Sequence, residues 1–112
     1  MVLDPSVRIV LVSRQRIRQL FNDGQYLQRA RSGEFRRIVI TDYAANSSKT
    51  GQPKGTRTQM VAYVNSNDEE IALVHQYVKP DGSFGGSGQQ DPKRLRQGDF
   101  LYLIDPDDPY GH

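Results

Sequence analysis

In the first part of the chain, the pattern of apolar residues is typical of a β-strand over 7–12 and of an α-helix over 14–22. Residues 7–12, VRIVLV, are rich in β-branched side chains and predict a strand, although Asp4 and Pro5 leave open a helix that starts there. Ser13 is placed to cap a helix over residues 14–22, whose buried stripe is Ile17, Leu20 and Phe21. A second short helix over 25–33 and a strand over 35–41 follow.

The second half of the chain has the alternation and turn residues of paired strands. Residues 58–65 and 70–78, joined at 66–69, predict a β-hairpin, whereas the small polar residues of 44–56 predict a long loop. Asp91 and Pro92 resemble the cap and first residue of a one-turn helix over 92–97, which Gly98 would end. Residues 99–104 predict a last strand.

These elements predict an α+β fold. We expect a mostly antiparallel sheet of four or five strands, with one or two short N-terminal helices packed on one face. The 112 residues suit one domain over 1–104, followed by a flexible acidic tail over 105–112.

Composition removes several kinds of chemistry. The chain has no cysteine, and its two histidines are His75 and His112, so thiolate chemistry and a conventional zinc site are excluded. We expect no metal, nucleotide or redox cofactor. The run VRIVLVS is too short for a signal peptide or a membrane span, which predicts a cytoplasmic protein without a membrane partner.

Positive charge is concentrated near the N-terminus. The net charge is +2, but residues 8–37 hold eight arginines against Asp23 and Glu34, a local excess of +6. Arginine binds phosphate through planar, bidentate contacts, so this segment predicts contact with a nucleic-acid backbone. The candidate binding residues are Arg14, Arg16, Arg18, Arg36 and Arg37, with Lys93, Arg94 and Arg96 as a second anchor.

Two other interpretations of this charge stay open. The basic residues could bind an acidic protein partner. They could also form a solvated face in which arginines pair with acids of the same chain, namely Glu34, Asp42, Asp68, Glu69 and Glu70.

His75 is the candidate catalytic residue. In an extended strand it shares a face with Tyr77 and Lys79, and a histidine can move protons near neutral pH. A metal-independent endoribonuclease needs little more: His75 as general acid or base, Tyr77 to orient it, and Lys79 or Arg94 to stabilise the phosphorane. The alternative is a hydrogen-bonded, inert histidine at the rim of the sheet.

A glycine-rich loop follows this strand. Gly82, Gly85, Gly86 and Gly88 would let backbone amides approach a phosphate, next to a basic cluster. The loop has neither the P-loop pattern nor a dinucleotide fingerprint. It is equally compatible with a flexible connection.

The stretch HQYVKPDGSFGGSGQQDPKRL, preceded by TRTQMVAYV, resembles a segment of small uncharacterised bacterial proteins of similar length, which brings no assigned activity. The order of helices before a sheet in a short basic chain is also similar to RelE-type and related microbial ribonuclease toxins. That second resemblance implies RNA as substrate and no metal.

The sequence therefore favours a small basic protein that binds RNA or another phosphate backbone. The first alternative is a toxin-type endoribonuclease that uses His75. The second is an interaction module that docks an acidic partner or dimerises through a sheet edge, with the oligomeric state left open.

Overall fold

The computed structural model of the chain describes residues 6–85 and 90–109. In chain order the elements are β1 (Arg8–Val12), α1 (Arg14–Asp23), α2 (Tyr26–Arg31), β2 (Arg36–Ala44), α3 (Ser47–Thr50), β3 (Arg57–Val64), β4 (Glu70–Val78), β5 (Asp91–Gln97) and β6 (Phe100–Ile104).

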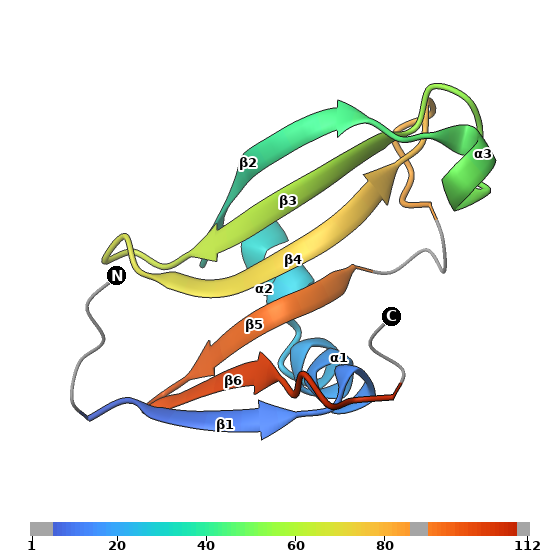
Figure 1. The fold of residues 1–112 in the computed structure, drawn as a ribbon. Coiled ribbons are helices and arrows are strands. Elements are labelled where there is room, and N and C mark those ends of the chain that lie inside the picture. Colours follow the sequence, from blue (N-terminus) through green and yellow to red (C-terminus); the bar gives the residue numbers. More distant parts are fainter. Residues whose placement is uncertain (1–5, 86–89, 110–112) are drawn as a thin grey trace.

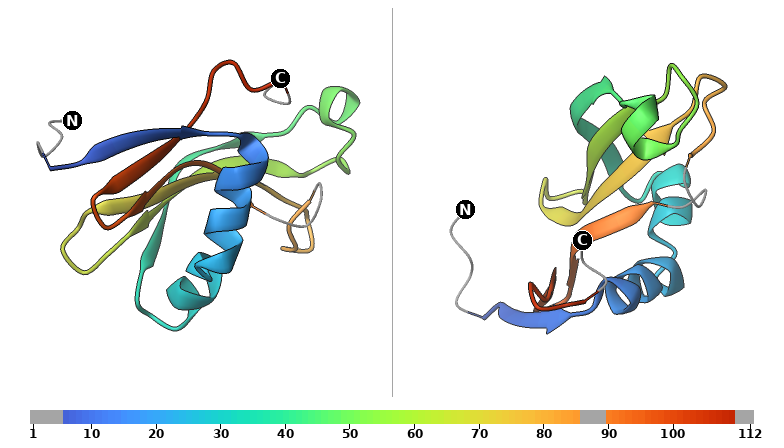
Figure 2. Two further views of the ribbon diagram at one scale, coloured as in Figure 1. Left: turned by 90° about the horizontal axis from the view of Figure 1, so that it is seen from below. Right: turned by 45° about the vertical axis from the view of Figure 1, so that its right-hand side comes forward.

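A single twisted sheet organises the fold, with its strands in the order β1-β6-β5-β4-β3-β2 (Figure 1). β1 pairs with β6 in parallel, and every other neighbouring pair is antiparallel. α1 and α2 follow one another on one face of the sheet, while α3 lies apart from them (Figures 1 and 2). The α+β class is thus confirmed, with six strands in a mixed sheet in place of four or five.

The core lies between the two helices and the middle of the sheet. Ile17 and Phe21 of α1 are 0% and 3% exposed, and the Phe21 ring stacks on Tyr26 at 5.4 Å. They pack with fully buried residues of the central strands, namely Val61, Tyr63, Val74 and Leu95. This packing confirms the predicted apolar stripe of the first helix.

Local signals explain the elements that sequence predicted well. The Ser13 hydroxyl accepts a hydrogen bond from the amide of Arg16 at 3.0 Å, which is the expected cap of α1. β3 and β4 form the predicted hairpin, with Met60 opposite His75 and Thr58 opposite Tyr77.

Among the described residues, no helix is long and apolar enough to cross a membrane.

The predicted helix over 92–97 is wrong, because these residues form the strand β5. Gly98 does not end a helix. Gly98, at φ +57°, and Asp99 form a two-residue turn between β5 and β6. This turn places Gln97 opposite Phe100. Pro92 fits into the strand because it lies at a bulge opposite Val74, where a missing amide donor is tolerated.

Defined contacts are also present within segment 44–56 and in the first residues after β6. The segment 44–56 contains α3, whose start is capped by the Asn46 side chain. Of the acidic tail, residues 105–109 are described and lie against the start of α1. The Asp105 amide donates to the carbonyl of Val12 at 2.8 Å, and Asp108 is 6% exposed. Residues 110–112 lie outside the described part of the chain.

Candidate functional site

His75 is half-buried near the centre of the sheet, on β4. Its Nε2 lies 2.6 Å from the hydroxyl of Thr58 on β3, which fixes the orientation of the ring. The rings of His75 and Tyr77 pack edge to face, with 4.7 Å between their centroids. Lys79, the third residue of the predicted catalytic set, lies just beyond β4. Its backbone amide donates a hydrogen bond to the carbonyl of Ser83 at 2.8 Å.

Asp91, at the start of β5, gathers three positive side chains. Lys93 Nζ lies 2.8 Å from the Asp91 carboxylate, Arg18 Nη2 3.5 Å and Arg14 Nη1 3.9 Å. Asp91 is also the residue opposite His75 in the β4–β5 register. We call Asp91, Arg14, Arg18 and Lys93 the Asp91 cluster.

The Asp91 cluster is partly open to solvent and electrostatically coupled to His75. Burial and the charge of Lys93 lower the pKa of His75 below its usual value, and Asp91 offsets this only in part. Burial alone would raise the pKa of Asp91, but the hydrogen bond from Lys93 and the charges of Lys93 and Arg18 lower it. At neutral pH the histidine is therefore neutral and the carboxylate ionised.

Three of the remaining predicted binding arginines, on β2 and β5, are held by acidic residues of the β3–β4 turn and of the start of β4. Arg94 donates two hydrogen bonds to Glu70, at 2.6 and 2.9 Å. Arg96 lies 3.7 Å from Glu69, and Arg36 pairs with Asp68. These three contacts agree with the alternative interpretation of the basic residues, in which the arginines pair with acidic residues of the same chain.

Arg37 is directed along the sheet. Its guanidinium donates to the side-chain oxygen of Gln76 and lies 5.5 Å from the Tyr63 ring and 5.8 Å from the Phe84 ring. Gln76 is itself 4% exposed and accepts a second hydrogen bond from Gln90. Arg37 thus completes a buried polar network. Arg16, by contrast, is on the exposed side of α1 and contacts Gln19 at 3.0 Å.

The described part of the glycine-rich loop uses its amides internally. Gly82 donates to the carbonyl of Lys79 at 2.8 Å, and Gly85 donates to the carbonyl of Tyr77 at 2.9 Å. A Cβ on Gly85 would collide with the Gln52 side chain and lie 3.0 Å from the Tyr77 Cβ, so close packing explains this glycine. Gly86 and Gly88 lie outside the described residues.

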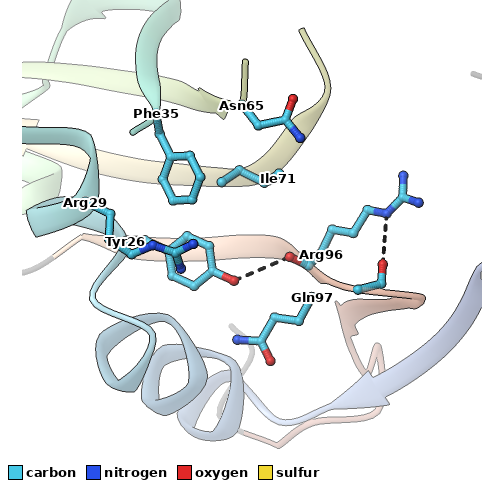
Figure 3. Close-up of a pocket in the computed structure, with 8 residues that line it drawn as sticks. Tyr26, Arg29, Phe35, Asn65, Ile71, Arg96 and Gln97 are labelled. Carbon is cyan, nitrogen blue, oxygen red and sulfur yellow. Dashed lines mark hydrogen bonds between the residues drawn. The ribbon is translucent and has the colours of Figure 1, made fainter. Parts of the chain in front are cut away.

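A separate hollow of about 400 Å³ lies near the opposite end of β5 (Figure 3). Phe35 and Ile71 line one side of it and Tyr26 and Gln97 the other, with Arg96 beside them. Arg96 is held by the Gly98 carbonyl at 3.4 Å. Along the seven residues of β5 this hollow is about 20 Å from Asp91, so the two features are distinct.

Within the described ranges, no three acidic or histidine side chains gather closely enough to hold a metal ion. No protein-family model matches the chain, and comparisons with curated proteins and with solved structures find no match either.

Sequence reasoning missed Asp91 and Thr58 as parts of this site. The Pro92 that follows Asp91 is typical of a helix start and so favours a helix cap at Asp91, and the strand partner of Asp91, His75, is sixteen positions away in the sequence. The two-residue turn QGDF, which identifies β5 and β6 as a hairpin, was the available signal.

Proposed function

We propose that this protein binds the phosphate backbone of a nucleic acid, RNA in the first instance, at the Asp91 cluster. The observation that carries the proposal is the convergence of Arg14, Arg18 and Lys93 on one carboxylate beside His75. Arg18 and Lys93 share the Asp91 carboxylate, and at Arg14 a second carboxylate, that of Asp108, accepts from the backbone amide at 2.6 Å. Arg94, in contrast, has a carboxylate of its own in Glu70.

The geometry suits an extended anion. α1 supplies Arg14 and Arg18 while β5 supplies Lys93, so the donors come from two elements that the core holds rigidly. The Arg18 side chain is 44% exposed and can turn its donors toward a phosphate without leaving Asp91. Contacts of this kind bind the backbone with little preference for base sequence.

Salt dependence tests the proposal. We would measure the affinity for a labelled single-stranded RNA, and for DNA of the same sequence, by fluorescence anisotropy between about 50 and about 300 mM salt. Each lost backbone contact reduces the slope of log affinity against log salt by about 0.7 for a single strand. The double variant Arg18→Ala/Lys93→Ala should therefore lower it by about 1.4.

The matched control is Arg36→Ala/Arg57→Ala, which removes two exposed arginines that are paired with Asp68 and Asp42. We expect its slope to equal that of the wild type. Equal slopes in all three proteins would contradict the proposal. Absence of salt-dependent affinity for either nucleic acid would do the same and point to an acidic protein surface as the partner.

A second candidate, an endoribonuclease, is supported by the state of His75. A neutral imidazole, oriented by Thr58 and next to Lys93, can accept a proton. In the proposed step His75 takes the proton of a 2′-hydroxyl, whose oxygen attacks the adjacent phosphorus. The bond to the 5′-oxygen breaks, giving a 2′,3′-cyclic phosphate and a 5′-hydroxyl that takes its proton from water. The hydroxide left behind takes the proton from His75, which becomes neutral again. Lys93 replaces Lys79 and Arg94 as the cation for the phosphorane.

Cleavage of mixed cellular RNA in EDTA, followed on a denaturing gel, tests this second candidate. The wild type should produce fragments, and His75→Ala should produce none while keeping its circular dichroism spectrum and its RNA affinity. Binding without cleavage by the wild type would leave the binding function and remove the catalytic one. Unfolding of His75→Ala would make the histidine structural.

A further inference from the structure

β2 is an uncovered edge of the sheet. It pairs with β3 on one side, and no strand of the described chain pairs with its other side. All nine of its residues are exposed, including Ile38 at 43%, Val39 at 49% and Ile40 at 55%. An edge of this kind presents free amides and carbonyls on which another strand can form hydrogen bonds. β2 has no lysine or proline to discourage such pairing, and its bulge between Val39 and Thr41 is the one interruption.

The charges along β2 complement those of a second, antiparallel β2. Arg36 and Arg37 stand at its start and Asp42 near its end, so antiparallel pairing brings opposite charges together at both ends. Arg37 is paired with Tyr63 and Asp42 with Gln59, two residues that share a face of β3. The bulge therefore places Arg37 and Asp42 on the same face, although they are five positions apart.

The opposite edge of the sheet lacks this complementarity. β1 has five residues, and its single charged residue is Arg8. Two copies of β1 could bring together apolar side chains but no pair of opposite charges. The Asp42 carboxylate contacts Arg57 of its own chain at 2.9 Å, yet it is 44% exposed and can accept further donors.

We propose that two copies of this chain associate through an antiparallel β2–β2 contact. Ile38, Val39 and Ile40 of both copies form its centre. Arg37 of each copy, which also donates to Gln76 of its own chain, lies in register with Asp42 of the other. The product is a continuous sheet with six strands from each copy. A single strand pair covers less than the roughly 800 Å² per partner of a standard interface, so we expect a dimer that forms at micromolar concentrations or above. This inference is independent of the proposed nucleic-acid binding.

Sedimentation equilibrium of the full chain at concentrations up to about 500 μM tests the contact. The wild type should dimerise, and Ile40→Lys should weaken dimerisation at least tenfold because it places two ammonium groups at the centre of the contact. The matched control is Ile9→Lys on β1, since Ile9 is 54% exposed and Ile40 55%. A monomeric wild type, or a stronger effect at Ile9 than at Ile40, would overturn the proposal.

The absence of cysteine from the chain allows a second test that does not depend on a charge substitution. Val39→Cys introduces a single thiol near the centre of the contact, where the two copies come within disulfide range of about 7 Å between Cα atoms. Mild oxidation should give a discrete disulfide-linked dimer much faster than in Ile9→Cys. Equal rates for both variants, or faster linkage in Ile9→Cys, would contradict the β2–β2 contact.

Discussion

Asp91→Asn should change stability and RNA affinity in opposite directions. The carboxylate contacts Lys93, Arg18 and Arg14 at 2.8 to 3.9 Å, and the side chains involved are 26% to 44% exposed. Because partly exposed ion pairs are screened by water, losing all three contacts should lower the free energy of unfolding by about 1 kcal/mol. Loss of the carboxylate meanwhile makes the Asp91 cluster more positive by one charge.

The added charge acts on binding through the phosphates. One more effective positive charge should make the salt slope steeper by about 0.7 and raise affinity about fivefold near 0.1 M salt. Urea unfolding gives the stability change, and anisotropy with the same labelled RNA gives the affinity. Asp68→Asn is the control, since Asp68 is 80% exposed and pairs with Arg36 outside the Asp91 cluster. An unchanged or flatter salt slope in Asp91→Asn would contradict phosphate binding at the Asp91 cluster.

Three further predictions concern pH, the core and the β5–β6 turn. Because the pKa of His75 is lowered in the folded protein, the unfolded chain takes up a proton at a higher pH than the folded chain does. The free energy of unfolding should therefore fall as the pH drops below about 6.5. Protonation of His75 also adds a positive charge to the site, so RNA affinity should rise over the same range. His75→Gln should remove both trends, as urea unfolding and anisotropy from pH 7.5 to 5.5 will show. Leu95 is fully buried, so Leu95→Ala should lower the free energy of unfolding, measured with urea, by about 2–4 kcal/mol. Leu11→Ala on the exposed strand β1 should lower it by well under about 1 kcal/mol. Gly98→Ala, at φ +57°, should lower the same free energy by about 1 kcal/mol through backbone strain.

The sequence predicted elements whose signals are local. Ser13 and the spacing of Ile17 and Phe21 are enough to define α1, and the alternation in 58–65 and 70–78 defines the hairpin. The parallel pairing of Arg8 with Phe100 joins residues at opposite ends of the chain, and no local pattern encodes it. For this reason the prediction of a mostly antiparallel sheet missed β1 as its parallel edge.

The candidate site was predicted in its residue types and only partly in its grouping. Arg18 and Lys93 were both named for their charge, but 75 positions separate them, and the fold alone brings them to the same carboxylate. Arg94 was named on the same grounds, yet Glu70 on the neighbouring strand binds it. Charge counted along a sequence does not show which cations already have a partner across the sheet.

Mapping the RNA contact on the protein, residue by residue, tests whether the backbone binds at the Asp91 cluster. We would titrate the isotopically labelled chain with a single-stranded RNA and follow every backbone amide by NMR. The largest shifts should occur at residues 14–18, 75 and 91–93, and they should shrink as salt is added. Shifts confined to the turn at 65–70, to the hollow around Phe35, or to no defined region would contradict binding at the Asp91 cluster.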